Sequence, residues 1–348
     1  MLERPAVHDE QIAACGQNDF GLTAVQIEFL PLGADVHTAV FRVVANDGTP
    51  YFLKLRTEPF DETSVALPRF LHDQGIGQII APLPSKTGRL WGQLAAYKAI
   101  LYPFVDGQNG YAAALSAGQW EELGRVLRQI HTAVVPGALY GRLRRETFAP
   151  LYRETVRRFL AGLDDGVAGD AVAADAVAAD AVARELTAFL RLKRQVILDL
   201  AARAERLAGA LSARPPDMVV CHSDLHAGNI LIGSRDFYIV DWDEPILAPK
   251  ERDLMYIGGG LMASGLAPQV EETLFYRGYG RQAQVSATAV AYYRYERIIQ
   301  DIAAYCEELL LTDAGGEDRA QSLLYLQSNF LPDQTIDIAC RSDMSGVG

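Results

Sequence analysis

The stretch Val219–Asp243, VVCHSDLHAGNILIGSRDFYIVDWD, carries the most informative pattern in the chain. Two short apolar runs, Asn229–Ile232 and Phe237–Val240, flank the turn sequence Gly-Ser-Arg-Asp, which predicts a β-hairpin. A hairpin brings the chain back to the level at which it began. We therefore expect Asn229, which enters the first strand, to lie near Asp241, which leaves the second.

Asp224 precedes Asn229 by five residues, on the loop that leads into the hairpin. Two carboxylates and an amide oxygen are thus expected at one edge, and hard oxygen ligands of this kind suit Mg²⁺ with bound phosphates. Phosphoryl transfer needs such a metal, a carboxylate that orients the acceptor hydroxyl, and a lysine on the nucleotide. We predict Asp224 as the base and Asn229 and Asp241 as the metal ligands.

Lys54 is the candidate for the lysine that this chemistry requires. It is a lone charge in the apolar run Tyr51–Leu55, which predicts a strand. Asp61 or Glu62, on the helix predicted to follow, could pair with Lys54, and we favour Glu62.

The first hundred residues are predicted to form a small sheet-based lobe after a short initial helix. Apolar or alternating runs predict strands, and Asn46-Asp47-Gly48 predicts a tight turn between two of them. The strands are expected at Ala24–Leu30, Thr38–Ala45, Tyr51–Leu55, Trp91–Leu94 and Ala99–Phe104. A helix is expected at Asp61–Asp73, with a kink or a break at Pro68.

After residue 107 the pattern becomes mainly helical. Helices are predicted at Ser116–Val134, Arg184–Ser212 and Ser286–Leu311. Residues 165–184 include a repeat of Asp-Ala-Val-Ala-Ala whose period of five leaves no apolar face on a helix, so an exposed low-complexity insertion without a catalytic role is expected. The predicted fold is α+β, with a small antiparallel-sheet lobe at 1–104 and a larger, mainly helical lobe at 107–348.

The pattern His222-x-Asp224-x-x-x-x-Asn229, followed by Ile-Val-Asp241-Trp-Asp, resembles the catalytic loop and metal-binding aspartate of the aminoglycoside phosphotransferase family. That family is similar in fold to protein kinases. The resemblance implies a two-lobed, protein-kinase-like fold and the same roles for Asp224, Asn229 and Asp241. It also places Lys54 on the α- and β-phosphates of ATP or GTP.

Further contacts are implied by the same resemblance. Tyr102–Val105, within a hinge at 102–106, resembles the segment whose backbone pairs with adenine. Leu30–Thr38 holds the place of the loop that covers the nucleotide, although Gly33 is its single glycine. Glu251–Leu254 resembles the segment whose aspartate, Asp253, braces the catalytic loop. The expected nucleotide-binding residues are Lys54, Glu62, Gly33, Pro103, Val105 and Leu231, with His222 and Asp253 as structural support.

The runs Trp242–Gly260, Leu71–Ile76 and Tyr292–Tyr305 look most like the spectinomycin phosphotransferases within this family. The expected reaction is therefore transfer of the γ-phosphate of ATP to a hydroxyl of an aminocyclitol such as spectinomycin, which inactivates the antibiotic. A formal charge of −12 suits a cationic acceptor. The candidate acceptor contacts are Asp243, Glu296, Asp301 and Glu307.

Other functions stay open at this point. The same chemistry on choline, homoserine or a sugar would fit an acidic or polar site. A metal-dependent hydrolase built on His222, Asp224 and His226 is disfavoured because no histidine follows His226 and no HExxH pattern occurs. A nucleotide-binding regulator without catalysis has no support, because each expected catalytic side chain is present.

The composition argues against some kinds of binding partner and some cellular compartments. Acidic residues number 44 against 32 basic ones, which disfavours a nucleic-acid partner. No run of 18 apolar residues occurs, so a membrane span is not expected. The sequence does not begin with basic residues followed by an apolar run, so a secretory signal is not expected either. Four scattered cysteines fit reduced thiols, with Cys221 expected in the core. We expect a cytoplasmic protein; the sequence carries no signal for an oligomeric state.

Overall fold

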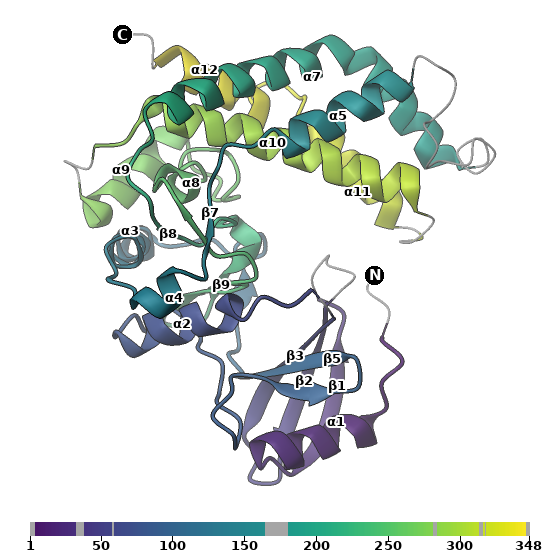
Figure 1. Cartoon of the computed structure of the whole chain (residues 1–348), viewed down its shortest axis with the longest axis vertical. Coiled ribbons are helices and arrows are strands. Elements are labelled where there is room, and N and C mark those ends of the chain that lie inside the picture. Colours follow the sequence, from purple (N-terminus) through teal and green to yellow (C-terminus); the bar gives the residue numbers. More distant parts are fainter. Residues whose placement is uncertain are drawn as a thin grey trace.

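Most of the chain up to residue 103 forms strands, and most of the chain after it forms helices (Figure 1). The computed structural model describes residues 4–32, 38–57, 59–163, 180–280, 284–312, 316 and 318–345. In Figure 1 the sheet lies at the bottom and the helical lobe at the top. The α+β, two-lobed fold predicted from the sequence is confirmed.

The small lobe is an antiparallel sheet with the strand order β1-β2-β3-β5-β4. Its strands are β1 Ala24–Leu30, β2 Thr38–Ala45, β3 Pro50–Arg56, β4 Gly92–Leu94 and β5 Tyr97–Pro103. The helix α1 (Asp9–Cys15), extended by a π-helical turn at Gly16–Phe20, packs Ile12 into the sheet core beside Phe41 and Leu55. The predicted turn between β2 and β3 is formed, with Gly48 in the left-handed region at φ 84°.

The helix α2 (Thr63–Asp73) differs from its prediction in two ways. It runs unbroken through Pro68, which is buried, so of the predicted kink or break the break is not formed. Its buried residues Leu67 and Leu71 belong to the core of the helical lobe, not to that of the sheet. Figure 1 accordingly shows α2 beside α4 (Gly137–Tyr140).

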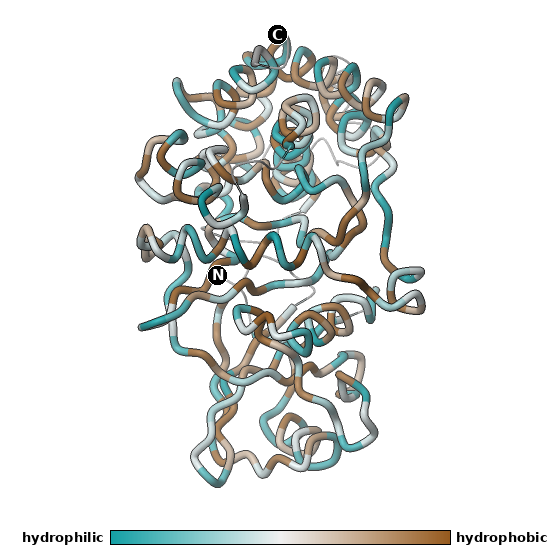
Figure 2. The backbone as a smooth tube through the Cα atoms, turned by 90° about the vertical axis from the view of Figure 1, so that its left-hand side faces the viewer, coloured by the Kyte–Doolittle hydropathy of each residue, from teal (hydrophilic) through white to brown (hydrophobic). Residues whose placement is uncertain are grey.

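The larger lobe is built around α10 (Ala287–Leu311), which contacts five other helices of this lobe along its length. The remaining helices are α3 Ala117–His131, α5 Leu151–Gly162, α7 Ala181–Ala213, α8 Glu251–Leu254, α9 Pro268–Tyr279, α11 Asp318–Ser328 and α12 Thr335–Ser345. Figure 2 shows hydrophobic and hydrophilic residues alternating along these helices, as amphipathic helices require. The three long helices predicted from periodicity, now α3, α7 and α10, are confirmed.

The predicted low-complexity insertion falls mostly on residues 164–179, which lie outside the described residues. Its last four residues form the first turn of α7, so this helix begins three residues earlier than predicted. The Asp180 carboxylate caps it by accepting the backbone N–H of Val182 at 2.9 Å. Each helix in the described part of the chain is too short or too polar to cross a membrane.

Two small sheets position the loop that carries Asp224. One has the order β10-β9-β6, and the other has the order β7-β11-β8. Their strands are β6 Gln108–Asn109, β7 Arg144–Arg145, β8 Val219–Cys221, β9 Ile230–Ile232, β10 Phe237–Ile239 and β11 Ile246–Ala248. β9 and β10 are antiparallel, with Ile230 opposite Ile239, so the predicted hairpin is confirmed. A 3-10 turn at Ala227–Asn229 leads into β9.

The helices α3 and α9 approach each other so closely that only glycine fits at two positions. A Cβ atom at Gly278 would lie 1.7 Å from the backbone oxygen of Glu121, and one at Gly124 would lie 2.2 Å from that of Phe275. This packing fixes the position of α3, the helix that ends at His131.

We predict that Gly278→Ala lowers the free energy of unfolding by about 1–3 kcal/mol or more, because backbone atoms must move to admit the methyl group. The matched control is Gly118→Ala on α3, where a Cβ would meet no atom within 4 Å. It should be neutral or stabilise by up to about 1 kcal/mol. Urea unfolding of both variants tests this, and equal stability would contradict the described packing.

Candidate active site

The loop between β8 and β9 gathers the oxygen-bearing side chains predicted from the sequence. The Asn229 side-chain amide donates to the backbone oxygen of Asp224 at 2.7 Å and to its Oδ2 at 3.3 Å. The backbone N–H of Val240 donates to the backbone oxygen of Asn229 at 3.0 Å, which brings Asp241 to the same edge. Because Asn229 donates through Nδ2, its amide oxygen is left for a cation.

Lys54 on β3 reaches this edge from the small lobe. Its Nζ lies 2.8 Å from Asp241 Oδ1 and 2.7 Å from Asp243 Oδ1. Burial would lower the pKa of Lys54, but the charges of Asp241 and Asp243 outweigh it and raise the pKa, so the ammonium stays protonated. Burial would likewise raise the pKa of Asp241, but Lys54 outweighs it and the pKa is lowered.

A second ion pair lies beside the first and was not predicted. Arg56 Nη1 is 2.5 Å from Asp243 Oδ2. Arg56 follows Lys54 by two residues, and Asp243 follows Asp241 by two. Side chains two apart share a face of a strand, so the spacing of Lys54 and Arg56 on β3 is the signal that could have placed Arg56 beside Lys54.

Two of the predicted contacts are corrected by this arrangement. The expected pairing of Lys54 with Glu62 is not formed; Glu62 Oε2 instead lies 2.8 Å from Arg142 Nη2, because α2 packs on the helical lobe. Asp243, expected to contact the acceptor, is held by Lys54 and Arg56.

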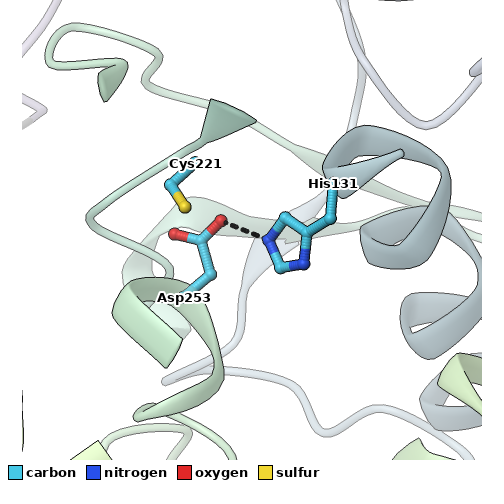
Figure 3. A group of neighbouring side chains, drawn as sticks. All are labelled: His131, Cys221 and Asp253. Carbon is cyan, nitrogen blue, oxygen red and sulfur yellow. Dashed lines mark hydrogen bonds and ion pairs between the residues drawn. The ribbon is translucent and has the colours of Figure 1, made fainter. Parts of the chain in front are cut away.

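Asp253 on α8 braces the loop from behind, with the contacts that its predicted role requires. Its carboxylate accepts the backbone N–H of His222 at 2.9 Å and that of Ser223 at 2.7 Å. His131 Nε2 lies 3.0 Å from Asp253 Oδ2 (Figure 3). Burial would raise the pKa of Asp253, but these contacts outweigh it and the pKa is lowered. His131 was not predicted; Tyr279 in turn bonds its Nδ1 at 2.8 Å.

Within the described residues, His131, Cys221 and Asp253 form the one trio of potential metal ligands found close together (Figure 3). His131 and Asp253 are already engaged in the bonds just described. The Cys221 thiol points to backbone oxygens of Ala248 and Pro249, and burial raises its pKa well above the ordinary value. His131 and Asp253 thus belong to the hydrogen-bonded brace of the loop, and the Cys221 thiol lies beside it.

His222 is placed as a structural residue. Its Nε2 donates to the backbone oxygen of Val240 at 2.9 Å, and its Nδ1 accepts the backbone N–H of Asp224 at 3.3 Å. The ring also packs edge-on against Trp242, with the ring centroids 4.7 Å apart. Both ring nitrogens are thus used within the loop, which gives no support to the hydrolase alternative.

Two non-glycine residues of the site have left-handed backbone conformations, Ser223 at φ 75° and Asp241 at φ 64°. Each such residue costs of order 1–3 kcal/mol and persists where its surroundings hold it. Ser223 is held by Asp253 and by a bond from its hydroxyl to the backbone oxygen of Glu244 at 2.8 Å. Strain of this kind is concentrated at functional sites in proteins.

Both carboxylate oxygens of Asp224 have hydrogen-bond donors. Oδ1 accepts from Arg297 Nη1 and from the Tyr256 hydroxyl at 3.2 Å, while Oδ2 lies 3.3 Å from Asn229 Nδ2 and 3.5 Å from His226 Nε2. Burial would raise the pKa of Asp224, but His226 and Arg297 outweigh it and hold the pKa well below its ordinary value. Asp224 is therefore ionised. Tyr256 and Arg297 were not predicted as site residues.

The acidic residues of α10 are placed in three different environments. Glu296 is 5% exposed, pairs with Arg153 at 3.3 Å, and has its pKa raised to about 7 by burial, so the prediction that it contacts an acceptor is wrong. Both faces of α10 are buried near this point, which the charge pattern did not reveal. Asp301 pairs with Arg297 at 2.9 Å, close to Asp224, and Glu307 is exposed.

The expected hinge passes over β9. β5 ends at Pro103, Val105 follows in the connecting segment, and a Cβ atom at Gly107 would lie 3.0 Å from Leu231. The chain that directly follows the expected hinge is thus close to Leu231. Gly33 lies outside the described residues.

Comparison with known proteins identifies the family. The model described as "Phosphotransferase enzyme family" matches residues 28–284. The structure of spectinomycin phosphotransferase APH(9)-Ia, in complex with ADP and spectinomycin, is 34% identical, covers 98% of this chain and 99% of that one, and has a TM-score of 0.85. Amicoumacin kinase hAmiN, in complex with AMP-PNP, Ca²⁺ and Ami, shares the fold alone, at 14% identity, coverage of 96% and 94%, and a TM-score of 0.62.

Protein StrN of Streptomyces griseus is 26% identical over 187 residues, which are 53% of this chain and 55% of that protein. The match therefore spans about half the length of this curated relative. The family model, by contrast, covers most of the chain, and the similarity to APH(9)-Ia extends over nearly all of it. The chain belongs to the phosphotransferase enzyme family, which confirms the predicted resemblance to aminoglycoside phosphotransferases and the predicted class of enzyme.

Proposed function

We propose that the chain is an ATP-dependent O-phosphotransferase that inactivates spectinomycin or a closely similar aminocyclitol by phosphorylating a hydroxyl group. The observation that carries the proposal is the meeting of Lys54 with Asp241, next to Asn229 and Asp224, where the two lobes join. The choice of acceptor is supported by 34% identity, over nearly the whole length, to a spectinomycin phosphotransferase crystallised with ADP and spectinomycin.

The nucleotide-binding half of the site consists of Lys54, Asp241, Asn229 and the expected hinge at residues 102–106. A carboxylate and an amide oxygen match the ligand preference of Mg²⁺, so Asp241 and Asn229 would hold this ion, and when bound it neutralises phosphate charge. Lys54, which is protonated and lies at the same edge, would bind the phosphates. Hinge backbone groups can pair with either purine, so GTP is a second candidate donor.

The acceptor half is centred on Asp224. Phosphoryl transfer proceeds through a loose transition state, so the main task of this carboxylate is to orient the attacking hydroxyl and receive its proton. Asp224 is ionised and 41% of its side chain is exposed, so it can be reached. The acidic balance of the chain favours a cationic acceptor.

With Mg²⁺ATP, the purified protein is expected to convert spectinomycin to a product one phosphate heavier. Asp224→Ala should lower the rate by about 10²–10⁴-fold, because the hydroxyl is no longer oriented and its proton has no acceptor. Asp199→Ala, at an exposed position on α7, should leave the rate unchanged. Mass spectrometry of the product and the rate of ADP release provide the two measurements.

Different outcomes would contradict the choice of spectinomycin as the acceptor and the proposed role of Asp224 in the reaction. Faster ADP release with choline, homoserine or a sugar than with spectinomycin would contradict the choice of acceptor but not the phosphotransferase. Full activity of Asp224→Ala would contradict the role of this residue.

Lys54→Met is expected to lower kcat/KM for ATP by about 10²–10³-fold, because a preorganised positive charge on the phosphates is lost. It should also remove most of the rise in Tm that Mg²⁺ATP produces in the unmodified protein. The control is Lys86→Met, an exposed lysine of the same lobe that bonds the backbone oxygen of Gln17. Equal thermal shifts in both variants would exclude phosphate binding by Lys54.

A further inference from the structure

Arg297 lies between two carboxylates on the acceptor side of the site. It projects from α10, and its guanidinium contacts Asp224 Oδ1 and the Tyr256 hydroxyl, the latter at 3.0 Å. Its Nε is 2.9 Å from Oδ1 of Asp301, one helical turn further along. A guanidinium presents its donors in a rigid, planar fork, so the Nη1 bond fixes the side from which Asp224 Oδ1 is held, while the contact of Nε with Asp301 is an ion pair.

The two oxygens of Asp224 are used differently. A carboxylate oxygen has two lone pairs, and those of Oδ1 face Arg297 and Tyr256. Oδ2 has the longer contacts, 3.3 Å to Asn229 and 3.5 Å to His226. Among the described residues, Asn229 is the one hydrogen-bond donor to Oδ2, because His226 at 3.5 Å lies at ion-pair distance, so Oδ2 keeps capacity for another hydrogen bond. Since 41% of the Asp224 side chain is exposed, an incoming hydroxyl can approach it.

Asp301 faces Arg297 as its ion-pair partner. Only 23% of its side chain is exposed, and 20% of that of Arg297. An acceptor ammonium bound to Asp301 would have to compete with a guanidinium that is already in place. The contact assigns to Asp301 the task of holding Arg297.

We propose that Arg297 is a positioning residue that anchors Asp224 through Oδ1 and leaves Oδ2 for the acceptor hydroxyl, and that Asp301 acts through Arg297 and not by binding the acceptor. This inference rests on the proposed phosphotransferase function and adds two residues to it. Transfer still forms the bond from acceptor oxygen to γ-phosphorus, breaks the bond to the ADP oxygen, and passes the hydroxyl proton to Asp224 Oδ2.

A double-mutant cycle with spectinomycin and Mg²⁺ATP tests the proposal. Arg297→Ala should lower kcat by about 10²-fold, because an unanchored carboxylate no longer aligns the hydroxyl, with the KM for ATP within about threefold of its original value. Asp301→Ala should lower kcat by about tenfold and leave the KM of the acceptor unchanged. The double variant should match Arg297→Ala alone, because Asp301 then has nothing to hold.

Two further arms separate positioning from a merely structural effect. Added guanidinium ion should restore part of the kcat of Arg297→Ala, and Arg297→Lys should recover less than the full rate because ammonium lacks the fork. Arg206→Ala is the matched control: its guanidinium also pairs with an aspartate, Asp343, between helices of the same lobe, and its loss should leave kcat unchanged.

The contradicting results are distinct from a failure of the proposed function. If Asp301→Ala raises the acceptor KM about tenfold in both backgrounds, Asp301 binds the acceptor and the inference is overturned. If the unmodified protein prefers another acceptor, the choice of spectinomycin fails, and the cycle run with that acceptor still decides the inference. Without turnover on any acceptor, a crystal structure of Arg297→Ala decides: a reoriented Asp224 carboxylate supports the inference, and an unchanged one overturns it.

Discussion

The buried carboxylate of Asp253 holds the arrangement on which the whole site depends. It binds two consecutive backbone N–H groups of the catalytic loop, at His222 and Ser223, and is itself bonded by His131. His131 ends α3, which is fixed on α9 by the close contact at Gly278. The packed helices thus hold Asp253 in place through His131, and Asp253 holds the backbone of the loop that carries Asp224. The same contacts hold Ser223 in its left-handed conformation.

The charges at the junction of the lobes are balanced in a way that suits a metal-bound nucleotide. Lys54 and Arg56 face Asp241 and Asp243, so each of these four charges has a partner of opposite sign. When a magnesium nucleotide binds, its phosphates can replace Asp241 as the partner of Lys54, and the magnesium ion can replace Lys54 as the partner of Asp241. The exchange does not leave the buried Lys54 ammonium as an unpaired charge, which would cost several kcal/mol. On the acceptor side, Arg297 provides the corresponding balance for Asp224 and Asp301.

The parts of the structure that were predicted correctly depend on local patterns. Alternating apolar residues and one turn predicted the β9–β10 hairpin, which brought Asn229 and Asp241 together, and a lone charge in an apolar strand identified Lys54. The errors concern contacts between distant segments. Helical periodicity shows that α2 has a buried face but not which lobe covers it, so Glu62 was assigned the wrong partner. Glu296 was expected at a surface because the pattern of charges does not show that α10 is enclosed. His131 and Arg297 act through contacts that no local spacing indicates.

The central claim is that Lys54, Asn229 and Asp241 form one binding site for a metal-bound triphosphate. A crystal structure of the unmodified chain with Mg²⁺ and a non-hydrolysable ATP analogue tests it most directly. The account predicts that Lys54 leaves Asp241 for the phosphates and that oxygens of Asp241 and Asn229 lie about 2.1 Å from the metal ion. A nucleotide bound elsewhere, with Lys54 still paired to Asp241 and Asp243, would contradict the account.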